Sequence, residues 1–363
     1  MRKLILMLIA IALVSALLTA GAGVALGAPA LTLVNLTRDG AVERNPSIEC
    51  AGNGDVFVAW AQDVLKNGVA QSDIVARVEQ AGVFGLAVNI SNSAAASSEP
   101  WLFPVGTASS VVYPETVGGP ESIFRSDWSG AAWSAPQLIA GGDYAGSEGP
   151  VGVQSTDGRV WLARWVHNSS RRSYLVVQQL GGPSFVVSQG GSVTRHPALV
   201  AGEAGEVYAV WVDHTSQPAG KAPGLRAAKV TASGVVQLPQ PSTDYYAYWP
   251  AAAYRGGQLY VAWVATSLGL VRERVWNGLA WARQVNIAKG DTPRVAVTAG
   301  QNVYVTWQAS GRIYLKKNLL APVVVSEGMR NASKPALAVD SAENAHVAFA
   351  AGGDIWYVQV AGP

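Results

Sequence analysis

The sequence contains a single cysteine, Cys50, among its 363 residues. One thiol cannot form an intramolecular disulfide, a Cys-x-x-Cys metal site or a redox pair, so scaffolds held by disulfides or cysteine-bound metals are excluded. Charged residues are also scarce, at 14% of the chain against 49% hydrophobic residues. With 39 glycines and 19 prolines, this composition excludes a disordered chain and favours short buried strands joined by turns. Cys50 is then expected to be a small core residue on a strand.

Common catalytic and cofactor-binding motifs are missing as well. The chain has no G-x-S-x-G elbow, no H-E-x-x-H zinc motif, no P-loop and no G-x-G-x-x-G sequence that opens a helix. Its four histidines are dispersed at positions 167, 196, 214 and 346. His346 is expected to be structural, whereas His196 and His214, with Asp213, are candidates for a metal or acid–base cluster. The sequence as a whole predicts no cofactor and no metal.

Long hydrophobic runs are confined to the N-terminus, since no other segment approaches 18 apolar residues. The chain begins with Met1-Arg2-Lys3, continues uncharged from Leu4 to about Gly27, and then reads Ala-Pro-Ala. This order of basic, apolar and small residues is typical of a secretory signal peptide. We expect residues 1–30 to be cleaved and the mature protein to be secreted or otherwise extracytoplasmic. An uncleaved membrane anchor is the alternative, because the apolar run is slightly long for a signal.

The mature chain also lacks a net charge. Removal of residues 1–30 takes away Arg2 and Lys3 and no acidic residue, so the net charge falls from +2 to 0. Binding to nucleic acid requires a concentrated basic face. We therefore expect no nucleic-acid partner, and contact with a membrane only through an uncleaved N-terminal segment.

One pattern is present seven times along the chain. Prolines recur at spacings of 54, 50, 47, 53, 43 and 42 residues: Pro46, Pro100, Pro150, Pro197, Pro250, Pro293 and Pro335. About fourteen residues after most of them, an alternating β-branched run ends in an aromatic residue: Trp60, Trp165, Trp211, Trp263, Trp307 and Phe349, with a weaker copy at Tyr113. Alternation with a period of two is typical of a half-buried strand.

Three further segments complete each copy. Glycine-rich turns such as Gly52-Asn53-Gly54-Asp55 precede the aromatic strand and indicate hairpins. A third strand such as SDIVARV and a fourth such as LAVNIS follow it. Four antiparallel strands repeated at this period are typical of a propeller blade. The sequence therefore predicts an all-β, seven-bladed β-propeller, formed by residues 31–363 as one monomeric domain.

The two ends of the chain indicate how the ring closes. The seventh copy stops after its third strand, at Val360, whereas the mature N-terminus begins with LTLVNL, a likeness of the fourth-strand copy LAVNIS. We expect this N-terminal strand to complete the last blade, because pairing there removes an exposed sheet edge.

Candidate functional residues lie in loops that a propeller brings to one face. The first strand of each blade lines the central channel, and the loops before it and between the second and third strands open on the same rim. The rim residues expected before the first strands are Arg44, Asn45, Glu99, Glu148, Arg195, His196, Tyr248, Trp249, Asp291 and Lys334. Those expected after the second strands are Gln62, Asp63, Glu115, His167, Asp213, His214 and Gln308. Solvation of a polar rim is the alternative explanation for each of them.

Tryptophan is abundant, with 13 residues, but most of its positions belong to the repeat. Five of them occupy one template position, which predicts packing between neighbouring blades: Trp60, Trp165, Trp211, Trp263 and Trp307. Trp101 and Trp249 flank the prolines in two blades only. These two are therefore the candidates for stacking against a ligand.

Two phrases, IFRSDWSGAAWS and LVRERVWNGLAW, resemble the third-strand turn of sialidase-like BNR-repeat propellers, whose Asp box reads roughly S-x-D-x-G-x-x-W. Ser126, Asp127, Gly130 and Trp133 keep the residue types at altered spacing, and the fifth copy lacks the aspartate. The likeness covers the mature chain as a style of repeat. It implies a turn-forming device, with Trp133 and Trp281 as structural residues, and no catalytic role for the box.

The same resemblance implies a possible catalytic set. Sialidases of this superfamily clamp a substrate carboxylate with three arginines and use a Tyr–Glu nucleophile pair with an aspartic acid. Carried over to this chain, the set would be Arg44, Arg195, Arg294, Asp63 or Asp73, and Tyr248. The chain departs from the family, because Arg44 keeps only the arginine and proline of the first motif and because the family generally has six blades.

Three function classes stay open. The favoured one is a non-catalytic binding propeller that recognises a glycan or a protein surface at the channel rim. Its binding residues would be Trp249, Trp101, Arg44, Arg195, His196, Asp213, His214, Glu99 and Glu148. The second is a divergent sialidase-like exo-glycoside hydrolase, and the third is a structural scaffold. Convergence of three arginines at the channel mouth would favour the hydrolase.

Overall fold

The computed structural model describes residues 31–66, 68–116, 121–144, 149–167, 173–188, 194–213, 224–242, 244 and 246–362. Every regular element in these ranges is a β-strand. The strands belong to one compact unit that begins at Leu33. Residues 1–30, which carry the expected export signal, lie outside the described residues. No helix in the described ranges has the length and hydropathy of a membrane span.

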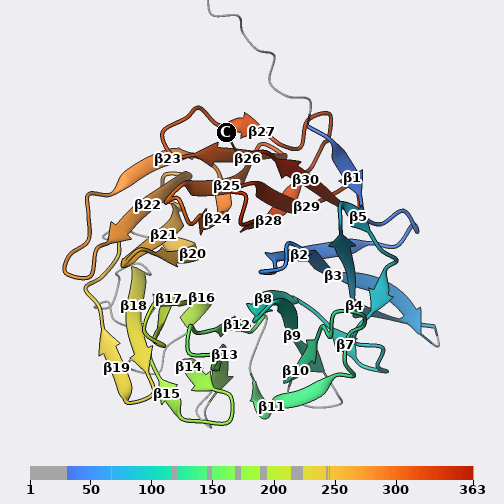
Figure 1. The fold of residues 1–363 in the computed structure, drawn as a ribbon, viewed down its shortest axis with the longest axis horizontal. Coiled ribbons are helices and arrows are strands. Elements are labelled where there is room, and N and C mark those ends of the chain that lie inside the picture. Colours follow the sequence, from blue (N-terminus) through green and yellow to red (C-terminus); the bar gives the residue numbers. More distant parts are fainter. Residues whose placement is uncertain are drawn as a thin grey trace, which may run out of the picture. The chain divides into compact units, whose positions relative to one another are not determined.

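Seven antiparallel blades form a ring around a central channel (Figure 1). The first contains β2 (Glu43–Cys50), β3 (Val56–Lys66), β4 (Val69–Gln80) and an outer strand divided into β5 (Val83–Phe84) and β6 (Val88–Asn89). The second contains β8 (Trp101–Val105), β9 (Ala108–Thr116), β10 (Glu121–Asp127) and β11 (Gln137–Tyr144), with β7 (Ala96–Ser97) against β9. The third contains β12 (Val151–Gln154), β13 (Val160–His167), β14 (Ser173–Gln179) and β15 (Ser184–Val186).

The remaining blades repeat this order. The fourth contains β16 (Thr194–Ala201), β17 (Val207–Asp213), β18 (Gly224–Thr231) and β19 (Gly234–Gln237). The fifth contains β20 (Ala247–Arg255), β21 (Gln258–Ala265), β22 (Leu270–Trp276) and β23 (Val285–Lys289). The sixth contains β24 (Asp291–Val297), β25 (Val303–Ala309), β26 (Arg312–Lys317) and β27 (Val323–Val324). The seventh contains β28 (Ser333–Val339), β29 (Ala345–Ala351), β30 (Asp354–Val360) and β1 (Leu33–Asn35). The predicted seven-bladed propeller is confirmed.

The N-terminal strand closes the ring as predicted. In Figure 1 the blue β1 lies beside the dark red β30, and the two pair antiparallel with Leu33 opposite Val358. Leu36, just after β1, is fully buried, and the Asn35 side-chain amide donates a 2.7 Å hydrogen bond to Asp354. The chain ends therefore share one blade, so its outer edge is occupied.

A fourth-strand motif that sequence reasoning missed recurs in four blades. A serine or threonine after the fourth strand accepts a hydrogen bond from the backbone N–H of the third strand, over 2.9–3.2 Å. The four acceptors are Thr37, Ser91, Ser188 and Ser326. The sequence signal is a hydrophobic residue followed by Ser or Thr, as in LVNLT, AVNIS, FVVS and VVVS. Because Thr37 follows this rule, the N-terminal strand is a true fourth strand.

The five template tryptophans form the interior between blades. Trp60, Trp165, Trp211, Trp263 and Trp307 are at most 3% exposed. Tyr113 and Phe349, which take the same position in the other two blades, are fully buried. The prediction of a packing role is confirmed, and Cys50 also packs, partly buried, against the core of the first blade.

The Asp-box-like segments are turns. Gly130 and Gly278 both adopt φ of 94°, a conformation that favours glycine. On either side of each glycine a tryptophan pair forms an isolated bridge, Trp128 with Trp133 and Trp276 with Trp281. The turn role that the resemblance implied is thus confirmed.

Candidate functional site

A cavity of about 270 Å³ occupies the central channel and is lined by residues of all seven blades. The recurring prolines of the first five blades form part of its wall. The rest of the wall comes from residues next to the recurring prolines along the first strands of all seven blades. Among the predicted rim residues, those that line it are Asn45, Glu99, Trp249 and Lys334. Trp101 and Arg294 line it as well.

A β-bulge directs these residues toward the channel. In five blades the pairing of the first strand with the second shifts register around the proline. The residue before the proline takes a left-handed conformation at Asn45, Glu99, Trp249, Thr292 and Lys334, with φ between 44° and 54°. A bulge bends its strand and re-aims the side chain. At four of these positions the residue before the proline lines the channel cavity: Asn45, Glu99, Trp249 and Lys334.

Arg294 is a departure from the repeat. The residues directly after the seven prolines are Ser47, Trp101, Val151, Ala198, Ala251, Arg294 and Ala336, so one blade alone places a charge at this level. Burial lowers the pKa of Arg294, while the charge of Glu99 acts in the opposite direction. Its Nη1 donates a 3.1 Å hydrogen bond to the carbonyl of Pro293. Among the described residues, no ion pair includes this guanidinium.

Glu99 is the acidic group of the mouth. Burial raises its pKa, and the hydrogen bond from the backbone N–H of Gly149 and the charges of Lys334 and Arg294 act against that rise. Gly149 is required at its position, since a Cβ there would lie 2.5 Å from the Glu99 carbonyl oxygen. Glu99 is therefore held in place by the neighbouring blade and faces two cations without an ion pair to either among the described residues.

Lys334 supplies the second cation. It is exposed, and its backbone N–H donates a 2.8 Å hydrogen bond to the side chain of Gln308. With Arg294 and Glu99 it gives the cavity two positive charges and one negative charge near the mouth. The cavity thus favours an anion that also offers a hydrogen-bond donor to Glu99.

The cavity wall has two chemically different halves. The charged residues come from the sixth, seventh, first and second blades, which are neighbours in the ring. The third, fourth and fifth blades contribute apolar groups: Pro150, Val151, Pro197, Ala198, Leu199, Val200, Pro250, Ala251 and Ala252. Trp249 lies at the edge of this half, with its ring 6.1 Å from that of Tyr248. A ligand of mixed polarity matches this wall better than a uniformly polar one.

Several residues of the sialidase-derived set lie elsewhere. Arg44 forms an ion pair with Asp63, and the two side chains are 41% and 45% exposed. Neither residue lines the channel cavity. The side chain of Arg195 lies outside the described residues, so only Arg294 of the three arginines is placed in the cavity. Tyr248 is partly buried in the core of the fourth and fifth blades and does not line the cavity.

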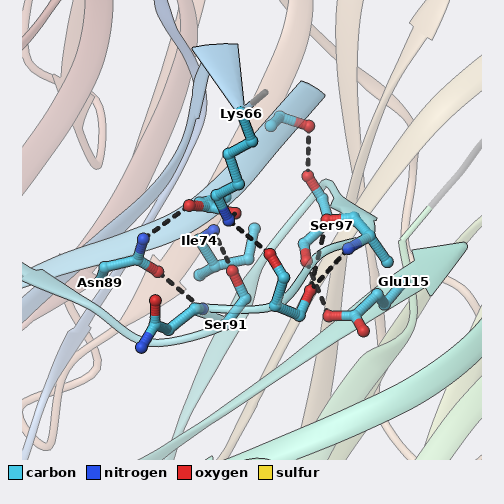
Figure 2. Close-up of polar contacts among 11 residues, drawn as sticks. Lys66, Ile74, Asn89, Ser91, Ser97 and Glu115 are labelled. Carbon is cyan, nitrogen blue, oxygen red and sulfur yellow. Dashed lines mark hydrogen bonds and ion pairs between the residues drawn. The ribbon is translucent and has the colours of Figure 1, made fainter. Parts of the chain in front are cut away.

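Asp73 belongs to a polar network at the junction of the first and second blades, in which Figure 2 labels Lys66, Asn89, Ser97 and Glu115. It is fully buried, and it accepts 2.6 Å hydrogen bonds from Lys66 and from the Asn89 side chain. In the same network Ser97 donates a 3.0 Å hydrogen bond to Glu115, which is 5% exposed. These contacts give Asp73 and Glu115 a structural environment away from the channel.

The other predicted binding residues are placed as follows. The Trp101 indole N–H donates a 3.1 Å hydrogen bond to the carbonyl of Gly152, so its polar edge is occupied by the next blade. Asp213 is 2% exposed and lies 3.5 Å from Arg226. His214, Glu148 and the side chain of His196 lie outside the described residues. Within the described ranges, no group of three or more His, Cys, Asp or Glu side chains is suited to a metal ion.

The propeller is similar to several solved structures at low sequence identity. A catalytically inactive virginiamycin B lyase from Staphylococcus aureus, with quinupristin, matches at a TM-score of 0.56 and 12% identity, over 91% of this chain and 98% of the lyase. A protein of unknown function from Dyadobacter fermentans matches at 0.53 and 11%, over 91% and 99%. A Hadza microbial sialidase matches at 0.52 and 13%, over 74% of this chain and 63% of the sialidase, less than two thirds of its length.

At these identities the likeness concerns the fold alone. It supports the β-propeller architecture of this chain. No protein-family model matches the sequence. No curated protein matches it either.

Proposed function

We propose that this protein is a binding propeller whose central channel takes an anionic ligand, a carboxylate carried by a glycan or by a protein. The observation that carries the proposal is Arg294, a guanidinium in the channel cavity that has no ion pair among the described residues. Burial disfavours the charged guanidinium, and a bound carboxylate would offset that cost through charge-assisted hydrogen bonds.

Two neighbours of Arg294 refine the expected ligand. Lys334 adds a second cation at the mouth, which strengthens attraction for a carboxylate. Glu99 would repel a bare anion, so the ligand needs a hydroxyl or amide N–H that donates to it. A sugar acid or an acidic peptide end offers both groups.

Binding is better supported than hydrolysis. A sialidase-type site needs arginines that converge beside a nucleophile pair and an acid. In the described residues Arg44 is engaged with Asp63, and Asp73 is engaged at a blade junction. Hydrolysis of a bound glycoside is therefore the alternative activity that the binding experiment must also measure.

The test is a glycan array of the mature protein, with carboxylate-bearing and neutral glycans, followed by titration of the hits. We expect acidic hits whose affinity falls at least tenfold in Arg294→Gln. The matched control is Arg44→Gln, which removes a guanidinium outside the cavity and should change affinity less than twofold. Arrays without acidic hits, or hits that Arg294→Gln leaves unchanged, would overturn the proposal. Turnover of a bound acidic glycoside would identify a hydrolase instead.

We also propose that residues 1–30 direct export and are removed. The support is the order of basic, apolar and small residues at the N-terminus. Mass spectrometry of the protein made by an exporting host should show a chain that starts near residue 31. A full-length, membrane-bound product would favour the anchor.

A further inference from the structure

Glu49 is a second charged departure from the repeat, in the same channel. The residues three positions after the seven prolines are Glu49, Phe103, Val153, Val200, Ala253, Ala296 and Ala338, so all the others are apolar. Glu49 lies on β2 and lines the cavity that also contains Arg294. Among the described residues, no side chain forms a hydrogen bond or ion pair with its carboxylate. At a position where the other copies of the repeat are apolar, the first blade thus has a carboxylate whose one partner among the described residues is the backbone N–H of Cys50.

Glu49 lies deeper in the channel than the two cations. Counted from the prolines, Arg294 is one residue along its strand and Glu49 is three, while Lys334 is one residue before its proline. A strand rises about 3.3 Å per residue, so the backbone of Glu49 lies about 7 Å farther along its strand than that of Arg294. Their strands, β2 and β24, flank β28 of the seventh blade, so the two charges lie on the same side of the ring.

The cavity is therefore dipolar along its axis. Its mouth carries the two cations Arg294 and Lys334 with Glu99, its interior carries Glu49, and the opposite wall is apolar. A ligand with a carboxylate alone would leave Glu49 desolvated and unpaired. A ligand whose amine lies about 7 Å from its carboxylate along the channel axis would span this difference in depth and pair with both ends. Two residues of extended peptide span about 7 Å, which is the separation between the ends of a dipeptide.

We infer that the channel recognises a small zwitterion of dipeptide length, with its carboxylate at Arg294 and Lys334, its amine at Glu49 and its apolar groups on the wall of the third to fifth blades. This inference rests on the proposed anion-binding function and adds the second charge. Burial raises the pKa of Glu49 to about 8, so the free carboxyl is largely protonated at pH 7. An ammonium group beside it favours the ionised form, so binding of the amine releases a proton.

The experiment is calorimetric titration of the mature protein with four probes. They are alanyl-alanine, its N-acetyl derivative, its C-terminal amide and alanine. We expect alanyl-alanine to bind at least tenfold more tightly than each of the other three. At pH 7, titration in buffers of different ionisation enthalpy should show proton release with alanyl-alanine and none with the N-acetyl derivative.

Three variants separate the two ends of the site. Glu49→Gln should abolish the preference for the free amine and the proton release, while it leaves affinity for the N-acetyl derivative within twofold. Arg294→Gln should weaken the binding of alanyl-alanine and of its N-acetyl derivative at least tenfold. Glu327→Gln, which removes an exposed carboxylate outside the cavity, should change nothing. Thermal melting of each variant checks that it is folded.

The failure of each proposal has a different signature. If the N-acetyl derivative binds as well as alanyl-alanine, or if Glu49→Gln keeps the preference, the zwitterion inference is wrong and anion binding stands. If neither alanyl-alanine nor its N-acetyl derivative binds and the glycan array also lacks acidic hits, both proposals are wrong. If acidic glycans bind but no dipeptide does, only the zwitterion inference is overturned.

Discussion

The backbone N–H of Gly149 donates a hydrogen bond to the carboxylate of Glu99, fifty residues earlier and one blade away. Both residues precede a channel proline of the repeat, and their contact joins the second and third blades at the mouth of the channel. A side chain at position 149 would collide with Glu99, since its Cβ would lie 2.8 Å from the Glu99 Cβ. The position of the acidic group in the site thus depends on a glycine in the next blade.

Substitution Gly149→Ala should therefore destabilise the propeller and displace Glu99. We expect a loss of about 1–3 kcal/mol in the free energy of unfolding, because the contact with the Glu99 backbone is too close for a flexible response. Denaturant unfolding measures it. Gly52→Ala is the matched control, because its Cβ would meet nothing closer than 3.6 Å, so it should stay within about 1 kcal/mol of wild type. Equal stabilities of the two variants would contradict the close contact.

Trp211→Ala tests the packing between blades. Trp211 is 1% exposed and lies in the core cluster of the third and fourth blades. Loss of the indole should leave a cavity and cost roughly 3–5 kcal/mol. Thermal and denaturant melts measure this cost, and Leu319→Ala, at a side chain 96% exposed, should change stability by less than about 0.5 kcal/mol. An unchanged melting temperature for Trp211→Ala would refute its core position.

Trp249→Ala should affect ligand binding more than stability. Trp249 lines the channel cavity at the edge of its apolar wall, and it is only partly buried. We expect a smaller loss of stability than for Trp211→Ala and a weaker affinity for the channel ligand. Titration of both variants with the same ligand compares them. Unchanged affinity in Trp249→Ala would remove this residue from the site.

Leu36→Ala tests the closure of the ring by the N-terminal strand. Leu36 is fully buried beside β30, although it comes from the other end of the chain. The truncation should cost about 2–5 kcal/mol, as for a leucine in a domain core. A single cooperative transition at a lower denaturant concentration is the expected result. If the variant unfolds as wild type does, the strand does not contribute to the blade.

Glu43 gives the stability a dependence on pH. It is 3% exposed, and burial together with the neighbouring Asp39 raises its pKa to about 8. The folded state therefore holds a proton that the unfolded state releases near the ordinary pKa of 4.5. The resulting stabilisation is complete below pH 4.5 and is lost as the pH rises through 8, at a slope of up to about 1.4 kcal/mol per pH unit.

Glu43→Gln should remove this dependence, because glutamine keeps the shape and has no proton to lose. The measurement is the free energy of unfolding of wild type and variant from pH 5 to 9. The difference between the two proteins isolates the contribution of Glu43, because Asp39 and Asp354 remain in both. The wild type should lose stability relative to the variant as the pH rises. A constant difference across this range would contradict a proton on buried Glu43.

Much of the fold was predictable from the sequence because its signals are local and repeated. The prolines mark seven first strands, and alternation marks the second strands, which contain Trp60 or Trp263. Each blade makes nearly the same contacts, so one template position has the same role in most copies. Even ring closure was predictable, because the N-terminal LTLVNL carries the fourth-strand pattern that the last copy lacks.

The candidate site was less predictable. Glu99, Trp249 and Lys334 of the expected rim line the channel cavity. Glu49 was not among the expected residues, although its layer of the repeat is otherwise apolar. The resemblance implied that Arg44 and Arg294 would belong to one catalytic set if the protein were a hydrolase, yet Arg44 pairs with Asp63 outside the cavity. Similar R-x-P or X-Pro motifs thus differ in the residues that contact them, because those residues come from other parts of the ring.

The sequence by itself determined the number of blades, the strands, the interior tryptophans and the closing strand, because strand periodicity and burial are properties of short segments. Only the tertiary structure decided which charges share the channel. The bulge at each proline sets the direction of its side chain, and residues such as Arg294, Lys334 and Glu99 belong to blades whose first strands meet only around the closed ring. What a charged side chain does depends on the groups that surround it in the folded protein, and those groups are far apart in the chain.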